Sequence, residues 1–409
     1  MVDVLNAPVT REPGPFRSAP FRWLLVGRTV NSFGGAISPV ALAFAVLHLG
    51  GSATQLGLVV ATYALFDVVT TLFAGVLGDR LSRTMLMQGA AALAAVSQGA
   101  VAVALITGWA TIPLLAVMSG VSGLLTALAG PSARALVVQT VRPASLQTAV
   151  SALRLSQNTA MVLGFSAAGL LVSLFGTGWA IGIDAATFAV SAACYAAIRV
   201  PPLAPPAPQS MLGDLRAGAV EVFRHTWLWV LIVQALVYHL MYGGAQGVLG
   251  PIVVSRSDGE AAWGWAMGAL MLGFMVGGVV TLRYRPKRLL FSGTVFLALT
   301  ACFPLAMGLH LDLSLVLLGA FLHGFGLEIF SVQWDLAIQQ NVAPDKLARV
   351  FAFDQVGSFV MRPLGLALTG PVAEVVGEAR WLLVIAAVMF GSTLLALLPP
   401  SVRHLNRGT

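Results

Sequence analysis

Hydrophobic residues form long runs in this chain, and short segments rich in charge, glycine and proline separate the runs. Residues 54–77 illustrate the pattern, because these 24 residues contain one charged side chain, Asp67. A helix of about 20 apolar residues crosses the hydrocarbon core of a bilayer, which is about 30 Å thick. Each run of this kind therefore predicts one membrane-spanning helix.

The pattern predicts twelve spans. They lie near residues 23–47, 54–77, 84–106, 110–133, 148–174, 178–198, 226–249, 261–282, 289–308, 313–339, 350–373 and 380–398. Composition agrees, since the chain is 58% hydrophobic and 10% charged, against about 25% charged residues in soluble domains. The expected fold class is all-α and polytopic. Residues 1–20 have no apolar core and contain four prolines, so we expect the first run to be a retained span rather than a cleaved signal peptide.

Basic residues are unevenly distributed between alternate loops. If both termini are cytoplasmic, the inner segments hold 18 Lys and Arg residues and the outer segments hold two, Arg256 and Arg380. This asymmetry predicts that orientation. The high share of Arg, Ala and Gly is typical of a GC-rich bacterial genome, so we expect a multi-pass protein of a bacterial inner membrane. Basic residues scattered over many loops argue against a nucleic-acid partner, and Cys194 and Cys302 lie in apolar segments, which argues against a disulfide.

The longest polar stretch divides the chain into two sets of six spans. We expect a cytoplasmic tail over 1–22, a six-helix bundle over 23–198, a cytoplasmic linker over 199–225, a second bundle over 226–398 and a tail over 399–409. The linker begins with a proline-rich segment, which is extended and semi-rigid. Hydrophobic residues then recur at helical spacing between Met211 and Phe223, and this predicts an amphipathic helix on the inner membrane surface.

An internal repeat supports the division. Residues 143–176 align without gaps to residues 344–377, an offset of 201. The identical positions are mostly glycine and proline, among them the pairs Gly164/Gly365 and Gly169/Gly370. Parallel six-span repeats occur in one large class of secondary transporters. The repeat therefore predicts that spans 5 and 11 occupy equivalent places, each close to helices of the opposite half.

The loop after the second span carries the sequence G-V-L-G-D-R-L-S-R at residues 75–83. It resembles the G-x-L-A-D-R-x-G-R motif of the major facilitator superfamily. Residues 47–59, 182–188 and 326–334 resemble the macrolide-efflux and enterobactin-exporter branch of that family. The resemblance implies two six-helix bundles and a gating motif. Its expected members are Gly75, Asp79, Arg80, Arg83 and Asp354.

The resemblance implies a secondary active exporter that alternates between inward- and outward-open states. We expect it to move a small amphipathic compound in exchange for protons. The exporter motif of span 5 is altered, because Phe165 stands where exporters have proline, so we expect span 5 to be straighter than usual. A proton-coupled importer or a facilitative uniporter is the alternative within transporters. A receptor or scaffold on the same fold is the alternative from another class.

Charged groups at membrane depth are costly, so each predicts a role. Glu328 near the middle of span 10 and Asp67 near the middle of span 2 are the candidates for proton coupling. We expect Asp335 to anchor a helix end, and Asp184 to lie near the outer surface with a structural role. His323 is expected to be a packing residue.

Further polar residues are candidates for the substrate cavity. The resemblance implies that spans 1, 4, 7 and 10 line it, and several polar side chains of spans 1, 7 and 11 share helical faces. The candidates are Arg28, Asn31, Gln234, Tyr238, His239, Tyr242, Gln246 and Arg362. Arg362 lies too deep to reach the surface, so we expect it to have a carboxylate partner.

Motifs for enzyme chemistry are missing from the sequence. It has no metal-ligand spacing, nucleophile elbow, phosphate-binding loop or Walker lysine. We therefore expect no enzyme activity, no cofactor and no metal. The expected partners are a small-molecule substrate, protons and the lipid bilayer, and we expect a monomer.

Overall fold

The computed structural model describes residues 14–78, 82–200, 211–344 and 346–405. Twelve helical segments of this part are long and apolar enough to cross a membrane. The described residues form helices and turns and contain no β-strand. The predicted all-α fold with twelve spans is confirmed.

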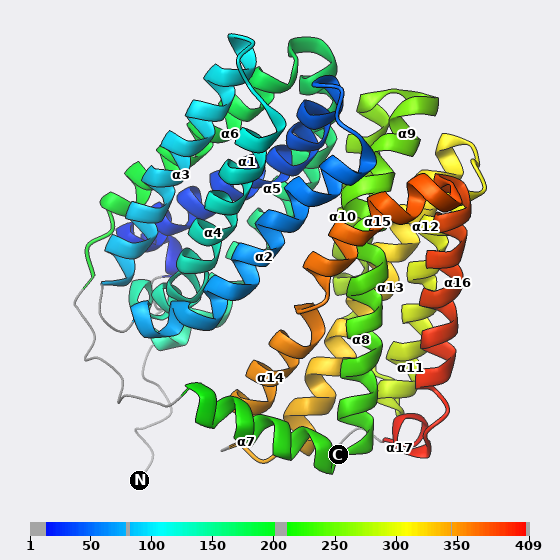
Figure 1. Ribbon diagram of the computed structural model, residues 1–409. Helices are drawn as coiled ribbons and strands as arrows, with labels where there is room; N and C mark the ends of the chain where they lie inside the picture. The colour runs from blue at the N-terminus through cyan, green and yellow to red at the C-terminus, as the bar shows by residue number, and fades with distance from the viewer. Residues whose placement is uncertain (1–13, 79–81, 201–210, 345, 406–409) are drawn as a thin grey trace.

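Six long helices form the first half of the molecule (Figure 1). They are α1 (Ala19–His48), α2 (Ala53–Gly78), α3 (Arg83–Ile106), α4 (Ile112–Thr140), α5 (Leu146–Phe175) and α6 (Thr177–Ala196), with the short helices η1 (Pro15–Arg17) and η2 (Pro143–Ser145). Side-chain caps help to set the helix starts. The hydroxyl groups of Ser18, Ser82 and Thr111 accept hydrogen bonds from the backbone three residues later, which satisfies donors that have no partner inside the helix.

The second half also has six spans, but three of them are interrupted. Span 7 comprises α8 (Thr226–Gly244), the π-turn η3 (Ala245–Leu249) and α9 (Gly250–Asp258), and span 9 comprises α11 (Leu289–Leu297), η4 (Ala298–Ala301) and α12 (Cys302–Gly308). Spans 8, 10 and 12 are α10 (Glu260–Thr281), α13 (Leu313–Asn341) and α16 (Glu378–Ala396), and the short α17 (Pro400–Arg403) follows. Span 7 thus continues nine residues beyond its predicted end, because the helix resumes after the π-turn.

Span 11 is divided into α14 (Leu347–Phe359) and α15 (Arg362–Val376). Pro363 lies in the first turn of α15, where its missing N–H and its ring prevent the helix from continuing back into α14. The repeat-equivalent span 5 is one continuous helix of 30 residues and contains no proline. Span 5 is thus continuous and its counterpart is the broken span, while the expectation that span 5 is straighter than in other exporters stays a prediction.

Close contacts join the two halves at one end of the molecule. α5 packs on α10 and α2 packs on α15, at the end that also carries α9 (Figure 1). Glycines allow this approach: a Cβ at Gly169 would collide with the backbone of Glu260 and Ala261, and a Cβ at Gly370 would collide with the backbone of Thr54. Small residues permit such close helix contacts in membranes.

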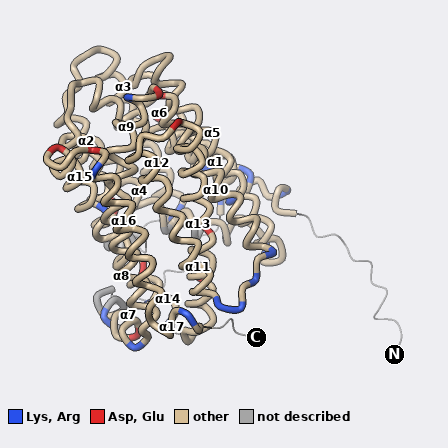
Figure 2. The backbone as a smooth tube through the Cα atoms, turned by 90° about the vertical axis from the view of Figure 1, so that its right-hand side faces the viewer, with Lys and Arg blue, Asp and Glu red and all other residues tan. Residues whose placement is uncertain are grey.

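The helix α7 (Met211–Arg224) lies at the opposite end and packs on α14. A Cβ at Gly218 would collide with the carbonyl of Arg349, and the rings of Phe223 and Phe353 are 6.2 Å apart. Lysine and arginine gather at the end with α7, α14 and α17, whereas acidic residues are prominent at the other end (Figure 2). This distribution is the one expected if α7 faces the cytoplasm.

Candidate functional site: a central cavity between the halves

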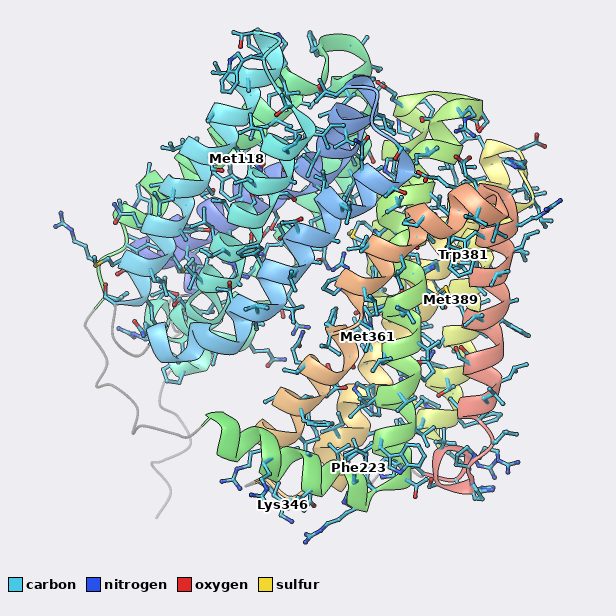
Figure 3. All side chains as sticks on the ribbon, viewed as in Figure 1. Met118, Phe223, Lys346, Met361, Trp381 and Met389 are labelled. Atoms are coloured by element: carbon cyan, nitrogen blue, oxygen red, sulfur yellow. The ribbon has the colours of Figure 1, made fainter. Side chains whose placement is uncertain are left out.

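A cavity of about 330 Å³ lies between the two halves. Its walls come from α1 to α6 on one side and from η3, α9, α10 and α15 on the other. Large apolar side chains dominate the lining: Tyr63, Met118, Phe165, Phe188, Trp263, Met267 and Leu366. Met118 lies on α4 in the first half, and Met361 lies at the break between α14 and α15 in the second half (Figure 3). The lining suits an amphipathic molecule, because ligand pockets are mostly apolar with few polar groups.

Two charged residues line this cavity, one from each half. Asp184 on α6 is the acid and Arg362 at the start of α15 is the base among the described lining residues. Neutral polar groups accompany them, including Ser38, Gln98 and Gln246. Asp184 borders the cavity from behind Ser38 and is itself fully buried, whereas Arg362 lies on the opposite wall.

Asp184 is held by three helices. Its side chain is fully buried, and it lies seven residues into α6, about 10 Å along the helix. The amide Nε2 of Gln98 on α3 donates to Asp184 Oδ2 at 3.2 Å and to Ser38 Oγ on α1 at 2.9 Å. Ser38 and Thr187 also hydrogen-bond the Asp184 carboxyl. Asp184 is thus enclosed by α1 and α3, and the expectation that it lies near the outer surface of the membrane with a structural role stays a prediction.

A glycine on α1 makes room for this cluster. A Cβ at Gly34 would collide with the Thr187 hydroxyl and lie 2.6 Å from Asp184 Oδ1. Sequence reasoning missed Asp184, Gln98 and Ser38 as a group, because each lies on a different span. The available signal was a polar residue in each of three apolar helices, which favours polar contacts inside the bundle but does not indicate which helices meet.

Arg362 and Asp67 attract each other across the interface between the halves. The salt bridges between described residues do not include this pair, so the two groups interact at longer range. The Arg362 side chain passes Gly243 of α8, where a Cβ would lie 3.3 Å from Arg362 Cγ. The expected paired carboxylate of Arg362 is therefore not observed among the described residues; Asp67 of the other half acts on it only at longer range.

Of the five polar candidates on span 7, Gln246 lines the cavity. It lies in the π-turn, and its Nε2 is 3.4 Å from Met267 Sδ of α10. Irregular turns of this kind often mark functional positions in helices. His239 is half-buried; its Nδ1 is 2.8 Å from the Ala235 carbonyl oxygen, and its ring is 4.1 Å from that of Phe359.

The tyrosines of span 7 lie inside the second half. The Tyr238 hydroxyl is 2.7 Å from His323 Nε2, while His323 Nδ1 is 2.7 Å from the Thr300 carbonyl oxygen. The Tyr242 ring stacks on His323 at 4.0 Å. Since the carbonyl can only accept, His323 donates from Nδ1 and accepts from Tyr238. His323 packs spans 7, 9 and 10 together in the way expected of a packing residue.

The remaining cavity candidates lie away from the cavity lining in this conformation. Arg28 Nη1 donates to the Ala133 carbonyl of α4 at 3.3 Å. Asn31, one turn further along α1, is half-buried. Gln234 is buried, and its Oε1 has no hydrogen-bond partner in the described structure. Roles for Arg28, Asn31, Gln234, Tyr238, His239 and Tyr242 in substrate binding stay predictions.

Glu328 lies where three helices meet. It projects from α13 over Gly277 and Gly278 of α10. Arg154 of α5, in the other half, attracts it, and Asp335 on its own helix repels it. Glu328 therefore faces the interface between the halves rather than the cavity lining.

The expected gating motif is described only in part. Asp79 and Arg80 lie outside the described residues, Gly75 lies in the last turns of α2, and Arg83 is the first residue of α3. Asp354 on α14 accepts hydrogen bonds from Trp334 Nε1 and from the Ser358 hydroxyl, both at 3.1 Å. In this conformation Asp354 is thus held within its own half.

Polar contacts reinforce the joined end of the cavity. His48 Nε2 of α1 lies 2.5 Å from Glu260 Oε1 of α10, within hydrogen-bond distance, and the Thr54 amide donates to Glu374 Oε1 at 3.2 Å. Both contacts cross from one half to the other. Together with Gly169 and Gly370 they close the cavity at this end. The groups of three or more His, Cys, Asp or Glu that a metal site needs do not occur among the described residues.

Twelve spans in two repeated halves around a cavity that is closed at one end define a polytopic membrane transporter. Residues 24–366 match the Major Facilitator Superfamily. The chain belongs to that family, and it is a multi-pass protein of the bacterial cell membrane.

Relatives of known name cover nearly the whole chain. The multidrug efflux pump Tap of Mycolicibacterium fortuitum is 27% identical over 406 residues, with 95% of this chain and 98% of that protein covered. Macrolide efflux protein A of Streptococcus pyogenes is 21% identical, with 89% and 91% covered. The expected resemblance to the drug-efflux branch is confirmed by these relatives.

Solved structures agree on the fold. The nucleoside transporter NupG has a TM-score of 0.73 at 13% identity, with 92% of this chain and 98% of that chain covered. The peptide-transporter family member PepTSo has a TM-score of 0.74 at 11% identity, with 93% and 97% covered. At these identities the likeness concerns the fold alone.

Proposed function

We propose that this protein exports small amphipathic compounds from the cell by alternating access. The observation that carries the proposal is the cavity between the halves, lined by large apolar side chains with one acid and one base. Its relatives Tap and macrolide efflux protein A are efflux proteins by name. A drug or secondary metabolite of moderate size is the substrate class that such a lining supports.

The conformation is, in this proposal, the inward-open one. The crossing contacts at Gly169, Gly370 and His48 seal the end opposite α7, and the basic residues favour a cytoplasmic location for α7. Both termini are then cytoplasmic. Substrate enters from the cytoplasm and leaves when the halves rock about the cavity.

The energy source in this proposal is proton antiport. Glu328 and Asp67 are carboxyl groups at membrane depth, and each is attracted by an arginine of the opposite half, Arg154 and Arg362 respectively. Protonation of a carboxylate weakens such an attraction, so it changes the relative stability of the two conformations. This gives a physical route from a proton gradient to movement of the halves.

An importer, a uniporter and a scaffold make different predictions for one experiment. Cells with and without the protein are loaded with ethidium or a macrolide, and accumulation is followed before and after an uncoupler is added. An exporter lowers accumulation, and the uncoupler abolishes the difference. An importer raises accumulation, a uniporter equalises it without regard to the uncoupler, and a scaffold leaves it unchanged.

The control for that experiment is a variant that inserts into the membrane but cannot bring the two halves together at the outer end. Gly370→Leu places a large side chain against the backbone of Thr54, so it should prevent closure at the outer end. If the variant reaches the membrane at the same level as the unmodified protein but does not lower accumulation, the lowering is due to transport by the protein itself. The oligomeric state is proposed to be monomeric, since each chain contains both halves of the cavity.

A further inference from the structure

Asp184 differs from the two carboxyl groups at the interface between the halves. Glu328 and Asp67 each interact with an arginine. The hydrogen-bond partners of Asp184 are the neutral groups of Ser38, Gln98 and Thr187. A buried ionised carboxylate with neutral partners is costly, because the interior does not replace the hydration that it loses. A group at this depth must gain a cation or a proton.

The burial of Asp184 decides between a cation and a proton as its ligand. The residue has 0% of its surface exposed, so an organic cation cannot reach its oxygen atoms directly. Ser38, in contrast, is half-buried and lines the cavity. Its hydroxyl hydrogen-bonds both Gln98 and the Asp184 carboxyl. A hydroxyl can accept one proton and donate another, so Ser38 connects the carboxyl to cavity water.

The other charged residues of α6 and of the helices that pack on it lie away from Asp184. α6 packs against α3, α1 and α5. Their titratable or charged residues, with those of α6 itself, are Arg22, Arg28, His48, Arg83, Arg154, Cys194 and Tyr195. Arg28 contacts the Ala133 carbonyl and His48 contacts Glu260. Each of the others lies at least ten residues along its own helix from the residue of that helix that is nearest the site. These reference residues are Ser38 on α1, Gln98 on α3, Phe165 on α5 and Asp184 on α6.

Two further titratable groups reach the cavity from other helices. Tyr63 of α2 hydrogen-bonds Thr126 and is close enough to Asp184 for their charges to interact. Arg362 of α15 lines the facing wall, where Asp67 attracts it.

We propose that Asp184 is a proton-binding site of the cavity, which exchanges its proton with cavity water through the hydroxyl of Ser38. In the outward-open state a proton from hydronium forms an O–H bond with an Asp184 carboxylate oxygen. In the inward-open state that bond breaks and the proton leaves to cytoplasmic water. The proposal rests on the proposed export function only for its role in transport, because proton binding itself needs no substrate.

Infrared spectroscopy tests proton binding directly. The purified protein, labelled with ¹³C-aspartate, is measured as a pH-difference spectrum. A titrating carboxylic-acid band that is sensitive to the label is expected in the unmodified protein and is expected to vanish in Asp184→Asn. The matched control is Asp312→Asn, the same change at an exposed helix start, which should leave the band in place. Asp67 is expected to keep its own titrating band in Asp184→Asn, so the proposal would be overturned if the aspartate difference spectrum of the variant were identical to that of the unmodified protein.

Two further variants keep the test informative. Ser38→Ala should shift the frequency of the band, because the protonated carboxyl loses a hydrogen-bond partner; an unshifted band would remove Ser38 from the route. If Asp184→Asn does not fold, Asp184→Glu serves instead. It should move the titrating band from the aspartate label to a glutamate label, and a band that stays with aspartate would contradict the assignment.

Transport measurements distinguish a failure of this inference from a failure of the proposed export function. In proteoliposomes with a pH gradient, Asp184→Asn should lose gradient-driven ethidium movement at least about tenfold, which corresponds to about 1.4 kcal/mol, while ethidium exchange without a gradient persists. Normal gradient-driven transport by Asp184→Asn would refute coupling at Asp184 and leave export standing. No transport by the unmodified protein, with the infrared band present, would refute export and leave the proton site standing.

Discussion

Gly169 of α5 and Gly370 of α15 hold equivalent positions in the two halves, and each lies against the backbone of a helix of the opposite half. Their neighbours Gly164 and Gly365 behave differently. A Cβ at Gly164 would meet Phe33 of α1, and one at Gly365 would meet Leu240 of α8. Spans 5 and 11 thus approach the opposite half as expected, through Gly169 and Gly370, while Gly164 and Gly365 pack within their own halves.

Gly169→Leu should prevent the outer end from closing. Overpacking of this kind costs about 1–3 kcal/mol in tightly packed interiors, and here the cost falls on the closed state. We expect normal membrane insertion and loss of export, measured as ethidium accumulation. Gly99→Leu is the control, because a Cβ there has open space around it. Full export by Gly169→Leu would show that this contact is not needed for closure.

Glu328→Gln should uncouple transport from the proton gradient. The change removes the charge that Arg154 attracts while keeping the size of the side chain. One proton supplies about 2.3 kcal/mol per 100 mV of membrane potential, so its loss should lower the concentration ratio more than tenfold. The measurement is gradient-driven uptake into inverted vesicles, with substrate binding followed separately. Unchanged uptake would transfer the coupling role to Asp67 or Asp184.

Asp354 should exchange its partners when the cytoplasmic end closes. It now accepts from Trp334 and Ser358, and we expect Arg80 or Arg83 to approach it in the outward-open state. The cysteine pair Arg83→Cys/Asp354→Cys, in a background without Cys194 and Cys302, reports this distance by cross-linking. Adding Gly169→Leu, which should hold the outer end open, is expected to increase cross-linking several-fold. No increase would argue against the gate.

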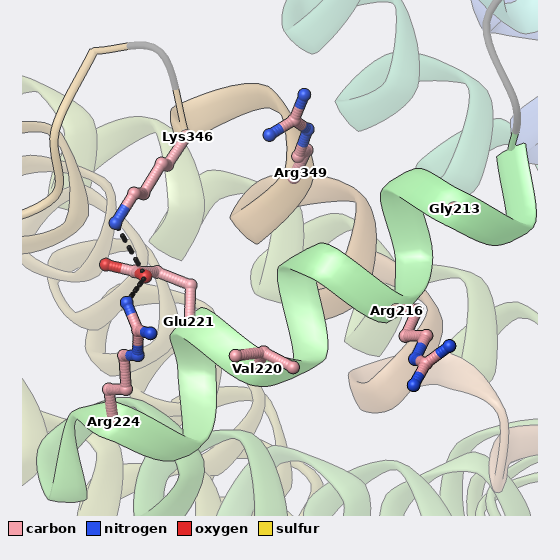
Figure 4. A pocket seen from close by; sticks show the side chains of 7 residues that line it. All are labelled: Gly213, Arg216, Val220, Glu221, Arg224, Lys346 and Arg349. Atoms are coloured by element: carbon pink, nitrogen blue, oxygen red, sulfur yellow. Dashed lines mark hydrogen bonds and ion pairs between the residues drawn. The ribbon is translucent and has the colours of Figure 1, made fainter.

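Glu221 should make the docking of α7 sensitive to acid. Lys346 Nζ is 2.9 Å from its carboxylate and Arg224 Nη1 is 3.3 Å away (Figure 4). The hydrogen bond from Lys346, aided by Arg224 and His225, holds the pKa of Glu221 below its usual value. Since the pKa is lowered in the folded state, the stabilisation is complete above the ordinary value of about 4.3. It is lost as the pH falls through the lowered value.

Hydrogen-exchange protection of the α7 amides, measured at pH 6 and below pH 4, checks this dependence. Glu221→Gln should lower protection at pH 6 and remove most of the difference between the two conditions. Arg216→Gln on the exposed face of the same helix serves as the control and should keep the difference. Equal pH dependence in Glu221→Gln would assign the effect to another group.

The spans were predictable from the sequence because a membrane demands a continuous apolar run for each crossing. The Asp184 cluster was not predictable, because it depends on how α1, α3 and α6 pack. Gly34, Ser38 and Gln98 are unremarkable within their own runs. In the same way, the sequence showed Tyr238 and Tyr242 on one helical face but not that His323 occupies the space they face.

The break at Pro363 gives span 11 two rigid parts and one joint. The outer part, α15, is fixed to α2 of the first half through Gly370, whereas the inner part, α14, is fixed to α7 through Gly218. Because the two parts of span 11 contact different partners, α14 can move together with α7 while the contact of α15 with α2 at Gly370 stays in place.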